Sequence, residues 1–144
     1  MLENDRLRGL AQINIAADDV AQVRDWYSRA FGIEAYFQRP DSGNPAYVEF
    51  RVGDNHAYEF GIINRKFLPP TTLEGSGSTI VRWHVDDIGA AVERLKRLGA
   101  TDNEQITERG GGFVTASVVD PFGNVLGLIH SPHYLAVLGG RDGD

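Results

Sequence analysis

The chain contains one pattern of residues twice, and the two copies are 68 positions apart. The first copy is INIAADDV at residues 13–20, and the second is VRWHVDDI at residues 81–88. Each is followed by an amphipathic segment that ends at a glycine, and the same offset aligns residues 57–60 with residues 125–128. A repeated strand–helix–strands unit predicts a pseudo-symmetric fold with a seam between the copies, and ligands often bind at such seams.

Residue periodicity predicts the elements of the first unit. Apolar and polar residues alternate around Ile13 and Ile15, as in a strand with two different faces. Asp18 or Asp19 is suited to cap the following helix, whose apolar stripe ends before Gly32. Further extended segments are expected at residues 34–38, 46–52 and 56–63.

The second unit repeats this plan. A helical stripe begins at Ile88, and strands are expected at residues 113–119 and 124–129, while residues 133–138 suit a short terminal helix. We therefore predict a single domain over residues 1–144. Its parts are a first βαβββ unit at 10–64, a linker at 65–78, a second βαβββ unit at 79–131 and a C-terminal tail at 132–144.

The composition excludes several classes of partner. The formal net charge of the 144 residues is −6, so binding to nucleic acid or to an anionic membrane surface is not expected. The absence of cysteine excludes disulfides and thiolate metal sites. The sequence contains neither a signal peptide nor an apolar run of about 20 residues, so no membrane span and a cytoplasmic location are expected.

Several short motifs carry a resemblance to a known family. They are DDV at 18–20, WY at 26–27, FG at 31–32, VDDI at 85–88 and VDPFGN at 119–124. Together they resemble the vicinal oxygen chelate superfamily, which includes glyoxalase I, bleomycin resistance proteins and extradiol dioxygenases. The resemblance implies a glyoxalase-like α+β fold, in which two tandem βαβββ units form a cup-shaped mixed sheet with helices on its outer face. It also implies a homodimer.

The resemblance implies four positions for a divalent metal, two in each unit. They fall at Gln12, Glu59, Ile80 and Gly127, and the 68-residue offset relates the two pairs in the same way. Gln12 and Glu59 offer oxygen donors, whereas Ile80 and Gly127 offer none. Because two protein ligands hold an ion weakly, we expect no cofactor, with a divalent metal as the alternative. Gln12 is then a polar strand residue that is hydrogen-bonded in the cup.

Strand alternation indicates which polar side chains line the cup. Arg82 and His84 face it if Trp83 packs against the second helix, and by the repeat Gln12 and Asn14 line the equivalent wall.

Glu59 lies in an otherwise apolar strand and therefore needs a partner. We hypothesise that Arg82 supplies the positive charge that a metal supplies elsewhere. The alternative for Arg82 is that it reaches solvent, and the alternative for His84 is a hydrogen-bonded wall residue.

These residues define one leading hypothesis and two rivals. The leading one is a metal-free protein that encloses an apolar or planar small molecule, with Gln12, Asn14, Glu59, Arg82 and His84 as its ligand-binding residues. The first rival is a metal-dependent lyase, isomerase or dioxygenase that acts on a vicinal-oxygen substrate with an incomplete set of protein ligands. The second is a metal-free enzyme with Glu59 or His84 as the base and Arg82 as the oxyanion stabiliser.

Overall fold

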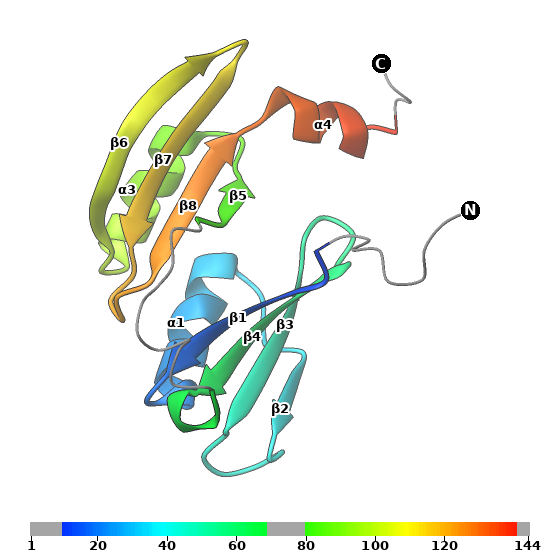
Figure 1. Cartoon of the computed structure of the whole chain (residues 1–144), viewed down its shortest axis with the longest axis vertical. Coiled ribbons are helices and arrows are strands. Elements are labelled where there is room, and N and C mark those ends of the chain that lie inside the picture. Colours follow the sequence, from blue (N-terminus) through cyan, green and yellow to red (C-terminus); the bar gives the residue numbers. More distant parts are fainter. Residues whose placement is uncertain (1–9, 69–79, 141–144) are drawn as a thin grey trace. The chain divides into compact units, whose positions relative to one another are not determined.

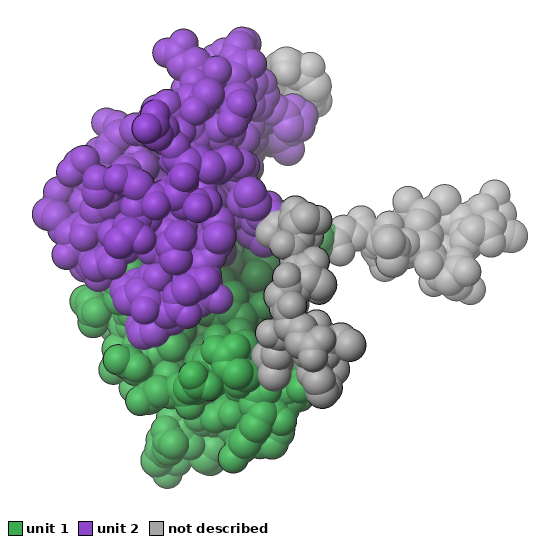
Figure 2. Space-filling model, turned by 60° about the vertical axis from the view of Figure 1, so that its left-hand side comes forward, with its two compact units in different colours: residues 1–76 green, residues 77–144 purple. Residues whose placement is uncertain are grey.

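The chain divides into two compact units, residues 1–76 and residues 77–144 (Figure 1, Figure 2). The computed structural model describes residues 10–68 and 80–140. Each unit holds a four-stranded mixed sheet with a helix packed on one face, which confirms the predicted α+β fold of two βαβββ units. We call the side of each sheet that carries the helix its helix face, and the other side its open face.

The described residues of unit 1, 10–68, form one strand, a helix, three more strands and a short 3-10 helix. Their bounds are β1 Gln12–Ala17, α1 Val20–Phe31, β2 Phe37–Arg39, β3 Tyr47–Val52, β4 Tyr58–Asn64 and η1 Arg65–Phe67. The strand order is β1-β4-β3-β2; β1 is parallel to β4 and the other pairs are antiparallel. The predicted linker begins with η1, and residues 69–78 of it lie outside the described residues.

Short sequence signals set both ends of α1. The side chain of Asp19 accepts a hydrogen bond from the backbone N–H of Gln22 at 3.1 Å, so Asp19 is the N-cap. Gly32 ends the helix with φ at 75°, a left-handed conformation that glycine adopts without steric cost. The N-cap recurs in unit 2, where Asp87 accepts from the backbone of Ala90 at 3.0 Å. Both caps agree with the sequence prediction.

Aromatic side chains fill the space between α1 and the helix face of its sheet. Tyr27 and Phe50 are 2% and 0% exposed, and the ring of Tyr27 lies 4.9 Å from the ring of Phe60. Burying a large apolar side chain contributes about 1.5–3 kcal/mol. An exposed ion pair contributes only about 0–1 kcal/mol. The aromatic core, and not the polar open face, therefore holds unit 1 together.

Unit 2 repeats the plan of unit 1 and adds a terminal helix. Its elements are β5 Arg82–His84, α3 Ile88–Arg97, β6 Thr101–Gly110, β7 Phe113–Val119, β8 Val125–His130 and α4 Pro132–Leu138. The strand order β5-β8-β7-β6 matches that of unit 1, again with a parallel pair between the first and last strands. Helix α4 confirms the short helix predicted at residues 133–138.

Strand β6 has no counterpart among the strands predicted from periodicity. It is the edge strand of its sheet, and all of its residues are exposed except Glu104 and Thr107, which are partly buried. Its pairing with β7 shifts register three times, so polar and apolar residues do not alternate along it. A mostly solvent-facing edge strand gives no hydrophobic pattern from which it can be predicted.

The strand registers correct the predicted alignment of the two units. Asn14 lies opposite Gly61 in unit 1, and Arg82 lies opposite Gly127 in unit 2. Asn14 and Arg82 are 68 residues apart, but Gly61 and Gly127 are only 66 apart. The predicted equivalence of Glu59 with Gly127 is therefore wrong by two residues. By register, FGII at 60–63 matches LGLI at 126–129, and the equivalent of Glu59 is Val125.

Gly61 and Gly127 occupy the same place in the two sheets, and neither leaves room for a side chain. A Cβ atom on Gly127 would lie 2.5 Å from the backbone oxygen of Val81. A Cβ atom on Gly61 would lie 2.5 Å from Oδ1 of Asn14 and 2.6 Å from the hydroxyl of Tyr47. In each sheet, the glycine lets a polar side chain of the neighbouring strand lie across the open face.

We expect Gly127→Ala to destabilise the protein by about 1–3 kcal/mol, and Gly61→Ala to destabilise it less. The reason is that the new methyl group meets fixed backbone at Gly127 but movable side-chain ends at Gly61. Urea unfolding of the two variants beside the parent protein measures both changes. An equal or smaller loss for Gly127→Ala would contradict the close approach of Val81.

Candidate functional site

The open face of the first sheet brings together the three site residues predicted in unit 1. Gln12 and Glu59 lie opposite one another in the parallel β1–β4 pair, and the Gln12 amide donates to Oε1 of Glu59 at 2.7 Å. The Asn14 amide donates to Oε1 of Gln12 at 3.1 Å. Gln12 is thus hydrogen-bonded within the sheet, and it gives the Glu59 carboxylate a short hydrogen bond from within its own unit.

Strand β3 adds three residues to this face that were not among the predicted site residues. The Tyr47 hydroxyl donates to Oε1 of Glu49 at 3.0 Å. Nε of Arg51 lies 3.5 Å from Oε2 of Glu49 and 3.8 Å from Oε2 of Glu59. The sequence holds a signal for them, because YVEFRV alternates polar and apolar residues and its apolar members are buried. We call Gln12, Asn14, Tyr47, Glu49, Arg51 and Glu59 the unit 1 polar cluster.

Burial, together with the neighbouring carboxylates, suppresses the ionisation of the tyrosine in this cluster. Burial of the hydroxyl raises the pKa of Tyr47 from 10.0 to about 12, with further contributions from its hydrogen bond to Glu49 and from the charges of Glu49 and Glu59. Tyr47 therefore stays a hydrogen-bond donor throughout the neutral range.

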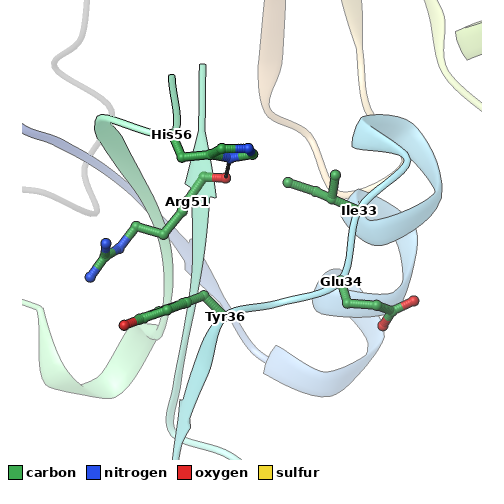
Figure 3. A pocket seen from close by; sticks show the side chains of 5 residues that line it. All are labelled: Ile33, Glu34, Tyr36, Arg51 and His56. Atoms are coloured by element: carbon green, nitrogen blue, oxygen red, sulfur yellow. Dashed lines mark hydrogen bonds between the residues drawn. The ribbon is translucent and has the colours of Figure 1, made fainter. Parts of the chain in front are cut away.

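A pocket of about 340 Å³ adjoins the cluster in unit 1. It is lined by Ile33, Glu34, Tyr36, Arg51 and His56 (Figure 3). Its volume lies within the range of roughly 300–1,000 Å³ that is usual for small-molecule sites. Ile33 and His56 extend toward one another, whereas the Tyr36 ring and the Arg51 guanidinium run side by side away from them (Figure 3). The guanidinium carbon lies 4.1 Å from the centre of the Tyr36 ring.

On the open face of the second sheet, Arg82 crosses from β5 to β6. Its Nη1 donates to the backbone oxygen of Ala116 at 3.0 Å, and its Nη2 donates to Oε1 of Glu104 at 3.0 Å. The register places Gly127 and Ser117 along this path, and Gly127 has no side chain to block it. A hydrogen bond from the Ser117 hydroxyl, and then the Arg82 guanidinium, hold the pKa of Glu104 below its usual range.

The hypothesised ion pair of Glu59 with Arg82 is not needed to neutralise either charge. Arg82 is paired with Glu104 in unit 2, and Glu59 is bonded to Gln12 and lies near Arg51 in unit 1. Glu104 was missed because it lies on the edge strand that periodicity does not reveal. The side chain of Arg82 is 24% exposed, so it reaches solvent only in part.

His84 is held from both ring nitrogens. Its Nδ1 accepts the backbone N–H of Ser131 at 3.1 Å, so the proton is on Nε2, which lies 3.1 Å from Oδ1 of Asp86. The ring stacks on Tyr134 with centres 4.8 Å apart, and the side chain is only 10% exposed. Of the two roles considered for His84, these contacts favour that of a hydrogen-bonded wall residue over that of a general base. Both ring nitrogens are already hydrogen-bonded within the protein, so neither is left for a substrate.

The donors do not fit the metal site that the fold class implies. Gln12 turns its amide nitrogen, and not its oxygen, toward Glu59. In unit 2 the positions equivalent to Gln12 and Glu59 by strand register are Ile80 and Val125, whose side chains have no metal-donor atom. Gly127, the position predicted from sequence, has no space for a side chain. Within residues 10–68 and 80–140, no group of three or more His, Asp or Glu side chains is placed to hold an ion.

Comparison with known proteins gives a family and a set of similar structures. The sequence model described as Glyoxalase/Bleomycin resistance protein/Dioxygenase superfamily matches residues 9–128. No curated protein matches the chain. In the described part of the chain, no helix is both long and apolar enough to cross a membrane.

Three solved structures illustrate the fold likeness. TioX from Micromonospora sp. ML1 is 18% identical with a TM-score of 0.63, over 85% of this chain and 98% of TioX. UcmS2 is 20% identical with a TM-score of 0.67, over 88% of this chain and all (100%) of UcmS2. A glyoxalase/bleomycin resistance protein from Catenulispora acidiphila DSM 44928 is 18% identical with a TM-score of 0.57, over 86% and 100% of the two chains. At these identities the likeness shows the fold alone.

The lowered pKa of Glu104 predicts a pH dependence of stability. A carboxyl group whose pKa falls on folding contributes stability above its unfolded pKa, and this contribution is lost as the pH falls below the ordinary value of 4.5 toward the folded value. We expect Glu104→Gln to lose stability at pH 7 and to show a weaker decline than the parent protein as the pH is lowered from 7 through 4.5 into the acid range. Urea unfolding across this range tests it. Parallel declines in the two proteins would contradict the assignment to Glu104.

The unit 1 polar cluster predicts a late-titrating tyrosine. In an ultraviolet titration of the folded protein, we expect one of the five tyrosines to ionise at about pH 12, and Glu49→Gln to move it toward 10.0. The raised pKa also implies that this group's stabilisation is complete below pH 10 and is lost between pH 10 and 12. If Glu49→Gln leaves every tyrosine titration unchanged, the Tyr47–Glu49 hydrogen bond is not formed in solution.

Proposed function

The chain belongs to the glyoxalase/bleomycin resistance protein/dioxygenase superfamily, and we propose that within it this protein binds a planar or apolar small molecule without a metal. The ligand lies on the open face of the first sheet, over the unit 1 polar cluster. Gln12, Asn14 and Glu59 provide polar contacts there, and Arg82 and His84 line the corresponding face of unit 2. We also propose that the protein is a homodimer and is located in the cytoplasm. Light scattering tests the homodimer.

One observation carries the proposal. The Glu59 carboxylate receives a 2.7 Å hydrogen bond from Gln12 and lies 3.8 Å from Arg51, so protein groups take the place of a positive ion. The cluster still faces outward, since the side chain of Glu59 is 34% exposed and that of Arg51 is 39% exposed.

Two further features support a binding role. The exposed ring of Tyr36 and the half-exposed ring of Phe37 lie beside the cluster and offer surfaces on which a planar ligand can stack. The adjoining pocket of about 340 Å³ provides space for a ligand of small size. Polar groups at fixed positions beside aromatic rings are the usual composition of a small-molecule site.

The first test is elemental analysis of chelator-treated protein after incubation with nickel, manganese, zinc and iron and thorough dialysis. We expect the amount of retained metal to stay far below one ion per chain. The reason is that Ile80 and Val125, two of the four positions related by the repeat, lack donor atoms. Protein that is not exposed to metal is the control. Retention of one tightly held ion per chain would overturn the metal-free proposal and favour the rival metal-dependent lyase, isomerase or dioxygenase.

The second test measures ligand binding. A set of planar heteroaromatic compounds is screened by thermal shift, and each hit is re-measured on Gln12→Ala and Glu59→Gln. We expect about threefold weaker binding by these variants, because each loses a hydrogen-bonding group at a partly exposed site. Glu93→Gln, an exposed change on α3 in unit 2, is the matched control. A screen without hits, or hits that are insensitive to both variants, would refute a site on this face.

A further inference from the structure

The guanidinium of Arg51 is itself a planar cation, and its neighbours are groups that suit such a cation. Its guanidinium carbon lies 4.1 Å from the centre of the Tyr36 ring, as in a cation–π contact. The same group lies between the carboxylates of Glu49 and Glu59. Figure 3 shows the guanidinium and the Tyr36 ring alongside each other, clear of the other residues drawn. One aromatic ring and two carboxylates therefore surround a flat, positively charged group.

The guanidinium does not use the full hydrogen-bonding capacity of these carboxylates. Its contacts with Oε2 of Glu49 and Oε2 of Glu59 measure 3.5 and 3.8 Å. Charge-assisted N–H···O bonds are usually about 2.7–2.9 Å long. By contrast, Oε1 of Glu59 receives Gln12 at 2.7 Å, and Oε1 of Glu49 receives Tyr47 at 3.0 Å. Both Oε2 atoms thus keep acceptor capacity for a ligand that carries N–H donors.

Arg51 is also easy to displace. Its side chain is 39% exposed, and ion pairs at such positions contribute little to stability because water screens them. A guanidinium that moves into solvent keeps its hydration and leaves the ring of Tyr36 and the two Oε2 atoms accessible. Because Tyr36 also lines the adjoining pocket of about 340 Å³, there is space for the uncharged part of a ligand beside the vacated position.

We propose that the open face of unit 1 binds a planar organic cation, an amidinium or a protonated amino-heterocycle, and that Arg51 occupies its place until it binds. The inference rests on the proposed function, and it narrows the class of ligand from a planar or apolar molecule to a planar cation. Glu49 and Glu59 receive the N–H groups of the ligand, and Tyr36 stacks on its plane. Arg51 is thus an internal competitor whose removal strengthens binding.

Arg39 provides a matched control on the same face. Its guanidinium carbon lies 5.3 Å from the centre of the Phe37 ring, and it forms no ion pair within residues 10–68. Arg39→Ala therefore removes one positive charge from this face without freeing either carboxylate. A purely long-range effect of charge would appear equally in Arg39→Ala and Arg51→Ala, whereas competition for the carboxylates appears only in the second variant.

The experiment titrates benzamidine, a planar cation, into the full chain by calorimetry or NMR, with neutral benzamide and anionic benzoate as matched probes. We expect benzamidine to bind, benzamide and benzoate to bind at least about threefold more weakly, and Arg51→Ala to bind benzamidine about threefold to fivefold more tightly. Glu49→Gln and Glu59→Gln are each expected to weaken it about threefold. Arg51→Met, which keeps the aliphatic stem, replaces Arg51→Ala if the latter does not fold.

Two results would overturn the inference. Equal binding of benzamidine and benzamide would show that the charge is not recognised. An Arg51 variant that binds benzamidine no better than Arg39→Ala would show that Arg51 does not compete for the site. If neutral planar hits depend on Gln12 while benzamidine does not bind, the cation inference fails and the proposed function stands. Absence of binding by every probe and every screened compound would refute both.

Discussion

The parallel pairing of the first and last strands is the constraint on which each unit depends. A parallel pair cannot be joined by a tight turn, so the chain must leave the sheet between β1 and β4, and again between β5 and β8. The helices α1 and α3 lie within these two connections and cover one face of each sheet. The polar side chains of both units gather on the opposite face, where in unit 2 the ring of Tyr134 in α4 stacks on His84.

The same pairing explains why the two open faces differ in chemistry. In both sheets a glycine of the last strand lies opposite a polar residue of the first strand, Gly61 opposite Asn14 and Gly127 opposite Arg82. Within the described residues, the short side chain of Asn14 donates to its neighbour Gln12, and the carboxylates of unit 1 are bonded by Gln12 of β1 and by Tyr47 and Arg51 of β3. Arg82 is long enough to cross its sheet to Glu104. The residue at this repeat position thus contributes to which strands provide the partners.

Much of the fold could be predicted from sequence because its signals are local. The caps at Asp19 and Asp87 and the left-handed Gly32 lie at the helix ends where the residue types place them. The register of the last strands could not be predicted in the same way. A one-residue slip moves every side chain to the opposite face, but a two-residue slip moves none, so the hydrophobic pattern fits an offset of 66 as well as one of 68.

The site shows a comparable division. Strand alternation and the repeat place Gln12 and Asn14 on one face, and the family resemblance places Glu59 together with Gln12. Arg51 could not be identified as the partner of Glu59, because pairing across a sheet depends on strand register. Glu104 could not be identified as the partner of Arg82, because β6 has no alternating pattern.

The consequence for function follows from how Glu59 is neutralised. A metal ion binds its ligands at fixed distances and directions, so it demands a complete donor set before it is held. Side chains make no such demand: Gln12 binds one oxygen of Glu59 closely, while Arg51 stays 3.8 Å from the other and remains partly in water. Exchanging such a partner for a ligand costs little, because one weak, solvated ion pair is replaced by another. A site that is neutralised by its own side chains is therefore suited to reversible binding, and its selectivity lies in the shape and charge of the group that takes the place of Arg51.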